Sequence, residues 1–64
     1  LSPIAYLKKV RINAACRELI HGNHTIARIA MDCGFCDQSY MTKEFARLMQ
    51  ITPQVYRDTH LRSL

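Results

Sequence analysis

Apolar residues recur at helical spacing along the chain, and residues that start or stop helices divide the pattern into segments. Ser2-Pro3 supplies a capping hydroxyl followed by a proline at the first helical position, where the missing N–H costs nothing. No glycine or proline follows until Gly22, which can adopt the left-handed conformation that commonly ends a helix. These signals predict a long helix over residues 3–21.

The same kinds of signal predict a second helix over residues 26–33. Asn23 or Thr25 can cap its start, and Gly34 ends it. Its apolar positions fall at the spacing of one helical face, and they are Ile26, Ile29, Ala30 and Cys33. We expect this face to point into the core.

Two further helices complete the predicted fold. Asp37 has a short acceptor side chain suited to capping a helix over residues 38–49. Thr52-Pro53 repeats the hydroxyl-plus-proline signal and opens a short helix over residues 53–59. The residues of these helices that we expect in the core are Met41, Phe45, Leu48 and Tyr56. No strand alternation competes, so the sequence predicts an all-α fold with about four helices.

Length and composition favour a small folded domain. A chain of 64 residues can hold one domain, and 48% hydrophobic residues are more than a disordered chain carries. Nine Lys and Arg against five Asp and Glu give a net charge of +4, which favours an anionic partner such as nucleic acid. No apolar run approaches the roughly 20 residues that cross a bilayer, so we expect a cytoplasmic protein with no membrane contact.

The second and third predicted helices form a helix-turn-helix, a motif that reads DNA. Their connection, Gly34-Phe35-Cys36-Asp37, is short and contains the expected glycine. When Met41 faces the core, the side chains on the far side of its helix are Ser39, Thr42, Lys43, Ala46 and Arg47. We therefore predict a homeodomain-like helix-turn-helix domain, with residues 38–49 as the recognition helix in the major groove of double-stranded DNA.

Motifs spread over nearly all of the chain carry a resemblance to one family. They are Ser2-Pro3, Tyr6-Leu7, Arg11, Ala14-Ala15, Ile26-Ala27-Arg28-Ile29-Ala30, Gly34-Phe35, Gln38-Ser39-Tyr40, Phe45, Thr52-Pro53 and Tyr56-Arg57. At these spacings the chain resembles the C-terminal part of the AraC/XylS family of bacterial transcription regulators. Taken together, the pattern is highly specific.

The resemblance implies a DNA-binding domain in which a linker helix joins two helix-turn-helix units, each entering one of two adjacent major grooves. Residues 1–21 would be the linker helix and residues 25–49 the second unit. Residues 1–64 would then be a single helix-turn-helix domain, a fragment of the larger two-unit domain. The first unit and an N-terminal sensing domain would lie outside this chain, and the full-length regulator would act with RNA polymerase.

The resemblance also assigns contacts to individual residues. Base contacts would come from the start of the recognition helix, at Gln38, Ser39, Thr42 and Lys43. A glutamine can bond adenine in a bidentate manner, and a lysine can reach the O6 and N7 acceptors of guanine. Phosphate contacts would come from Arg11, Thr25, Ile26 and Arg47. At Thr25 and Ile26 the donors would be amides at the positive end of a helix.

Three residues depart from the family pattern. Ala46 stands where relatives often carry a basic residue, so we expect one phosphate contact fewer. Gln50 occupies the position of the usual glycine after the third helix. A left-handed conformation there would cost roughly 1 kcal/mol, and a locally altered turn is the alternative. Met41 replaces the usual phenylalanine, which changes core volume more than chemistry.

A structural zinc site is an alternative interpretation. His21-x-x-His24 and Cys33-x-x-Cys36 place four possible ligands close together in sequence. Against it, Cys33 falls on the buried face of its helix while His21 ends another helix, so the helix pattern does not make the ligands converge. Because three cysteines cannot complete a set of internal disulfides, we expect free thiols. We expect no metal and no other cofactor.

Structural roles are the alternative for the predicted contacts. An ordinary solvated helix face would account for the polar residues of the third helix. The stem of Arg11 could pack against its neighbours while its guanidinium pairs with Glu18. Lys8 and Lys9 could reach phosphate, although exposed lysines are usually just solvated.

A protein-interaction module is a further alternative, because the first helix has two apolar faces. Ile12, Cys16 and Leu19 lie on one side, whereas Leu7, Val10 and Ala14 lie on another. In the family domain the first unit would cover the second face, so we expect an exposed patch there at which the isolated chain self-associates. The sequence has no glycine-rich phosphate loop and no spaced nucleophile, base and acid, so we expect no enzyme.

Overall fold

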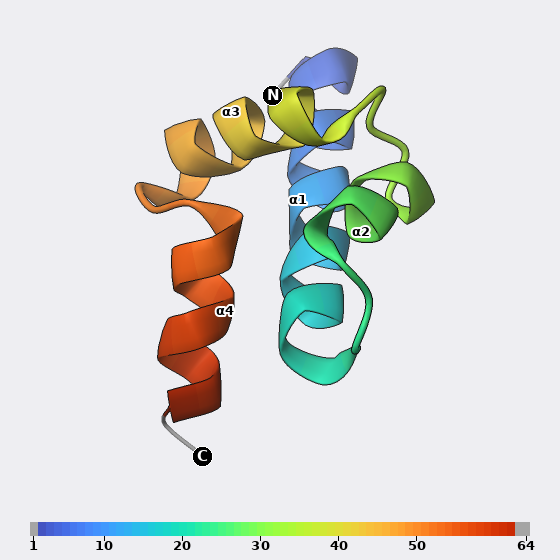
Figure 1. Ribbon diagram of the computed structural model, residues 1–64. Coiled ribbons are helices and arrows are strands. Elements are labelled where there is room, and N and C mark those ends of the chain that lie inside the picture. The colour runs from blue at the N-terminus through green and yellow to red at the C-terminus, as the bar shows by residue number, and fades with distance from the viewer. Residues whose placement is uncertain (1, 63–64) are drawn as a thin grey trace.

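The computed structural model describes residues 2–62, so positions 1 and 63–64 of the expected domain lie outside the described part. Over this range the chain forms four helices and no strands (Figure 1). They are α1 (Pro3–His21), α2 (Ile26–Asp32), α3 (Gln38–Met49) and α4 (Pro53–Arg62). The predicted all-α fold is confirmed, and the bounds of α1 and α3 agree with the prediction.

The bounds of α2 and α4 differ from the prediction. Cys33 ends α2 as its C-cap, so this helix is one residue shorter than expected. By contrast, α4 continues beyond Thr59, where the prediction ended it. No glycine or proline stops the helix there, and His60 Nδ1 lies 2.9 Å from the Tyr56 carbonyl oxygen.

Each helix begins at a side chain that accepts a hydrogen bond from a backbone N–H three residues later. The four capping residues are Ser2, Thr25, Asp37 and Thr52, and the bonds measure 2.8–3.2 Å. Of the two candidates for α2, Thr25 and not Asn23 is the cap. These bonds satisfy N–H groups that have no partner within the helix. The start of each helix is therefore determined by residues within its own first turn.

The end of α1 corrects one expectation. Gly22 is extended, with φ −102°, rather than left-handed. Its N–H donates to the Glu18 carbonyl at 2.9 Å, and a Cβ on Gly22 would lie 2.9 Å from that same oxygen. Glycine is therefore needed here for a close approach of two backbone segments and not for a positive φ.

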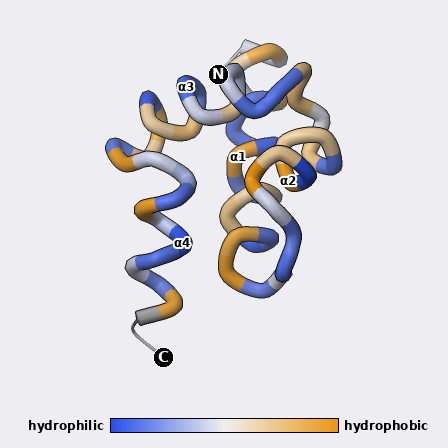
Figure 2. Tube along the Cα trace, in the orientation of Figure 1, coloured by the Kyte–Doolittle hydropathy of each residue, from blue (hydrophilic) through white to orange (hydrophobic). Residues whose placement is uncertain are grey.

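The long helix α1 lies at the centre of the fold, and the other three helices all pack against it. Apolar and polar segments alternate along the helices, as expected when one face of each is buried (Figure 2). The buried apolar residues are Ile12, Ala15, Leu19, Ile29, Ala30, Phe35, Met41 and Phe45. The ring of Tyr56 on α4 meets that of Phe45 edge to face, with 5.4 Å between centroids.

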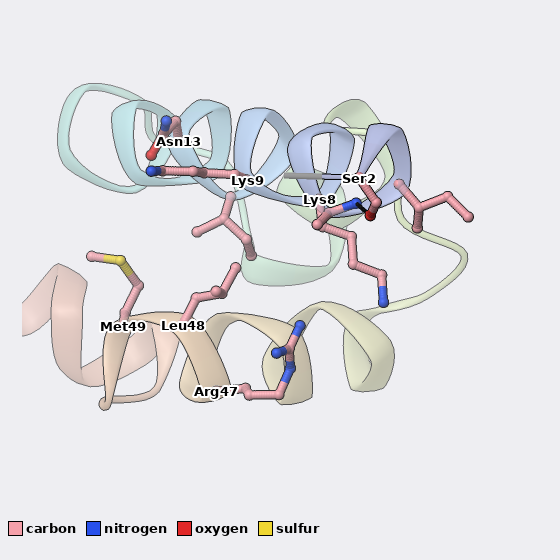
Figure 3. Close-up of a pocket in the computed structure, with 10 residues that line it drawn as sticks. Ser2, Lys8, Lys9, Asn13, Arg47, Leu48 and Met49 are labelled. Carbon is pink, nitrogen blue, oxygen red and sulfur yellow. Dashed lines mark hydrogen bonds between the residues drawn. The ribbon is translucent and has the colours of Figure 1, made fainter.

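Four residues expected in the core are less buried than the prediction required. Ile26, Cys33 and Tyr56 are half-buried at the edge of the core, and Leu48 on α3 is 41% exposed. Leu48 points toward the first turns of α1, across an open groove between the two helices (Figure 3). Helical spacing placed Leu48 on the inner face, but within residues 2–62 the groove that it faces is not filled.

Candidate nucleic-acid interface

A tight turn fixes the angle between α2 and α3. The N–H of Gly34 donates to the Met31 carbonyl at 3.2 Å, and the N–H of Phe35 donates to the Ala30 carbonyl at 2.9 Å. This pair of bonds is the Schellman motif, in which the glycine adopts a positive φ, here +90°. The buried ring of Phe35 then anchors the turn to the core. These bonds and the buried ring together set the position of α3 relative to α2.

Arg11 reaches this turn from α1. Its Nε lies 3.2 Å from the position that a Cβ on Gly34 would occupy, so the missing side chain of Gly34 makes room for it. Within residues 2–62 no acid forms an ion pair with Arg11, so the expected alternative of pairing with Glu18 is not observed. The structure therefore brings one predicted phosphate-contacting cation to the edge of the helix-turn-helix.

The predicted base-contacting residues all lie on the first two turns of α3. Gln38, Ser39 and Lys43 are exposed, and Thr42 is half-buried. Asp37 precedes them, and its carboxylate accepts the Tyr40 N–H at 2.8 Å, which fixes the start of the helix. One exposed helix end therefore presents an amide, a hydroxyl and an ammonium group to solvent.

Arg47 lies further along α3 and forms a charge cluster with two other residues. Its Nη2 donates to Glu44 Oε1 at 2.9 Å, and the same oxygen lies 3.4 Å from Lys8 Nζ on α1. The hydrogen bond from Arg47, and then the one from Lys8, hold the pKa of the Glu44 carboxyl below its usual range. We call these three residues the α1–α3 charge cluster. The Glu44–Arg47 pair lies within one turn of α3, whereas Lys8 reaches Glu44 from α1 through tertiary packing, which the sequence pattern did not indicate.

The remaining predicted phosphate contacts lie at the start of α2. Thr25 is exposed and uses its hydroxyl to accept the Arg28 N–H, at 3.1 Å. Ile26 is half-buried and packs against the core. These two residues lie at the N-terminal end of a helix of seven residues, and the other predicted residues lie on α1 and α3.

The turn after α3 keeps the left-handed conformation despite its glutamine. Gln50 has φ +67°, and its N–H donates to the Ala46 carbonyl at 2.9 Å. Its side-chain amide donates to the Arg47 carbonyl at 3.4 Å, which gives a second carbonyl at the end of the helix a partner. Of the two expected outcomes, the left-handed turn is therefore the one observed.

The four candidate zinc ligands do not converge. Within residues 2–62 no three His, Cys, Asp or Glu side chains gather at a site able to hold a metal ion. The thiols of Cys16, Cys33 and Cys36 are free. Burial raises the pKa of Cys33, and Glu18 and Asp32 nearby raise it further, which disfavours the thiolate that a metal needs.

The first turns of α1 carry exposed apolar side chains. The expected patch is present at Leu7 and Val10, which are 45% and 43% exposed, whereas Ala14 is half-buried. Ile4 and Tyr6, on the same turns, are exposed as well. We call Ile4, Tyr6, Leu7 and Val10 the α1 apolar patch.

Known proteins are similar to this chain in sequence. The chain matches the family model of a helix-turn-helix domain over residues 1–59. The virulence regulon transcriptional activator VirF of Yersinia enterocolitica is 38% identical over 61 residues, which cover 95% of this chain and 22% of VirF. A putative AraC-like transcription regulator of Streptomyces lividans is 38% identical over 55 residues, which cover 86% of this chain and 18% of that protein. The chain belongs to the AraC-type helix-turn-helix family.

A solved structure agrees with this AraC-type assignment. The C-terminal domain of the two-component response regulator yesN from Fusobacterium nucleatum superposes with a TM-score of 0.86 at 32% identity, covering 89% of this chain and 55% of that one. The predicted family and fold are confirmed. The AraC-type domain is a DNA-binding domain of transcription regulators, and its regulators bind double-stranded DNA.

The chain spans less than a quarter of the length of the relatives described above. Between residues 2 and 62, no helix combines the length and the hydropathy that crossing a bilayer demands.

Proposed function

We propose that this chain binds double-stranded DNA sequence-specifically as the second of two helix-turn-helix units in a bacterial transcription regulator. In this proposal α3 enters the major groove with its N-terminal turns first. The regulator would work in the cytoplasm and would contact RNA polymerase through its full-length form.

The observation that carries the proposal is the polar, exposed start of α3 on a rigid turn. Major-groove reading needs a helix whose first turns project short polar side chains and which does not tilt when it meets the bases. The capped start at Asp37 and the Schellman turn at Gly34 provide that rigidity. Gln38, Ser39, Thr42 and Lys43 then read bases.

Phosphate contacts would surround this reading surface and position it. Arg11 beside the turn and Arg47 in the last turn of α3 would contact phosphates, and the amides near Thr25 and Ile26 would add neutral donors. One unit neutralises few phosphates, so we expect the isolated chain to bind weakly and with strong salt dependence.

The rest of the regulator would complete this domain. The α1 apolar patch would pack against the first helix-turn-helix unit, for which α1 would serve as the linker helix. A separate sensing domain would lie beyond that unit.

An amide NMR titration with mixed-sequence duplex DNA at low and moderate salt tests DNA binding directly. We expect shifts confined to residues 25–26 and 37–47 that fade as salt rises. Silence at these residues would count against the proposal, and shifts around His21, His24, Cys33 and Cys36 on adding zinc would support the metal alternative instead.

Substitutions separate base reading from phosphate binding. Gln38→Ala or Lys43→Ala should relax the preference at one or two base pairs, at about 1–3 kcal/mol for each good contact. Arg47→Ala should weaken binding to all sequences alike. If Gln38→Ala lowered overall affinity with no change in preference, its role as a base reader would be wrong.

A further inference from the structure

Two cations from different helices converge on the groove between α1 and α3. Lys8 on α1 and Arg47 on α3 extend toward one another across it (Figure 3). None of the ten described residues that line this groove is acidic. Because like charges at close range repel, such a convergence needs a negative group beside the groove.

Glu44 provides that negative group. Its Oε1 lies 2.9 Å from Arg47 Nη2 and 3.4 Å from Lys8 Nζ, and its Oε2 accepts a second bond from Arg47 Nε at 3.4 Å. The Glu44 side chain is 13% exposed, whereas that of Arg47 is 59% exposed. The carboxylate therefore lies beneath the two cations, and the guanidinium lies outermost, where a phosphate would arrive.

The charges of this cluster decide how it attracts DNA. Two cations and one anion leave a net charge of +1 where Lys8 and Arg47 alone would give +2. A phosphate that takes the Nε and Nη2 edge of Arg47 competes with a carboxylate already bonded there, and one that binds Nη1 still meets the negative charge of Glu44. Gln38 and Ser39 lie in the first turn of α3, before Glu44, and their uncharged side chains do not form ion pairs.

We propose that Glu44 is an internal competitor for DNA phosphate, which lowers the sequence-independent part of the affinity by holding Lys8 and Arg47 in the α1–α3 charge cluster. This inference rests on the proposed DNA binding. It assigns to Glu44 a role in binding although its carboxylate would repel the ligand.

The substitution Glu44→Gln tests it, because glutamine keeps the shape of the side chain and removes its charge. We expect the variant to bind mixed-sequence duplex more tightly, on the order of tenfold at ~50 mM salt. The slope of log K against log salt should steepen by about 0.9, the value for one additional phosphate neutralised. Fluorescence anisotropy across a salt series measures both quantities, and circular dichroism verifies the helical fold.

Asp58→Asn is the matched control. Asp58 lies on α4, where it accepts a hydrogen bond from Gln54 Nε2 at 3.0 Å, and the substitution changes net charge by the same amount. The control should leave the salt slope unchanged. A Glu44→Gln slope equal to that of Asp58→Asn would overturn the inference, as would weaker binding by Glu44→Gln, which would mean that Glu44 positions Arg47 for phosphate.

The unaltered chain offers a second readout that does not depend on a variant folding. The carboxyl carbon of Glu44 can be followed by NMR as pH is varied, with and without duplex. A phosphate that displaces the Glu44 carboxylate from Arg47 should raise the pKa of Glu44 toward its usual range. A pKa of Glu44 that does not change when DNA binds would contradict the competition. If the unaltered chain shows no salt-dependent binding at all, the proposed function itself fails. Binding with no response at Glu44 removes only this inference.

Discussion

The two halves of α1 have similar apolar content but differ in how far their apolar side chains are buried. Residues 12–19 bury Ile12, Ala15 and Leu19 completely or nearly so, whereas residues 4–10 leave the α1 apolar patch open to solvent. Both halves belong to one uninterrupted helix, so secondary structure does not distinguish them. Burial is therefore set by what packs against a helix, and within residues 2–62 the α1 apolar patch is not covered even though α3 contacts the same half of α1 through Lys8.

Truncating one leucine in each half should give the largest contrast. Leu19 is fully buried, so Leu19→Ala should lower the free energy of unfolding by about 2–5 kcal/mol, through lost burial and the cavity left behind. Leu7 is 45% exposed, so Leu7→Ala should cost under about 1 kcal/mol. Urea unfolding followed by circular dichroism measures both. Equal losses would mean that the two halves do not differ as the structure implies.

Arg57 should give the next largest effect, because it fastens α4 to the end of the buried half. Its Nε donates to the Leu19 carbonyl at 3.1 Å, which places a positive charge at the C-terminal end of α1. Arg57→Ala should cost about 1.5–3 kcal/mol, the range for a hydrogen bond that involves a charged group. Arg28→Ala is the control, since Arg28 pairs with Asp32 on the surface, where such pairs contribute about 0–1 kcal/mol. A similar loss for both variants would contradict this role of Arg57.

A substitution at Gln50 should change the free energy of unfolding by a smaller amount, and should raise it. The turn at this residue leads α3 into α4 and so determines how α4 returns to the buried half of α1. Gln50→Gly removes the cost of a left-handed conformation and loses the side-chain bond to Arg47, so we expect a net gain of up to about 1 kcal/mol. In a domain of this size that corresponds to a rise in Tm of roughly 4–8 °C for each kcal/mol. A lower Tm would show that the amide bond outweighs the strain.

A substitution in the first half of α1 should have the smallest effect on the free energy of unfolding and a clear effect on self-association. Leu7→Lys should leave the free energy of unfolding within about 0.5 kcal/mol. It should abolish the self-association that we predict for the isolated chain at high concentration, which sedimentation velocity detects. Val55→Lys changes an exposed apolar residue of α4 outside the patch and should leave the association intact. An unaltered chain that sediments as a monomer at every concentration would end this interpretation.

Sequence predicted those features of the fold that depend on neighbours in the chain. The starts of all four helices followed from hydroxyl, carboxylate and proline residues that act within one turn, and the end of α1 followed from Gly22. The αL turn at Gln50 remained open in the sequence because two outcomes of similar energy compete there. The predicted left-handed conformation of Gly22 was wrong. Glycine permits several backbone conformations, and the contact with Glu18 selects an extended one.

Features that depend on distant contacts could not be predicted. Leu48 lies on the inner side of its helix but faces an open groove, and helical spacing cannot tell whether a neighbour fills that space. Nothing in the sequence singled out Glu44, because its contact with Lys8 depends on how α1 and α3 pack. The base- and phosphate-contacting residues stay predictions, since their partner is DNA.

The four self-capped helices have a kinetic consequence. Every helix carries its own start signal, and the turns between helices are only a few residues long, so much of the native order forms between residues close in the chain. Small domains dominated by such local contacts fold in microseconds to milliseconds. A chain of this size unfolds from time to time because its core is small. Rapid refolding then shortens each unfolded period. This limits the time for which proteases or other unfolded copies can reach the unfolded chain.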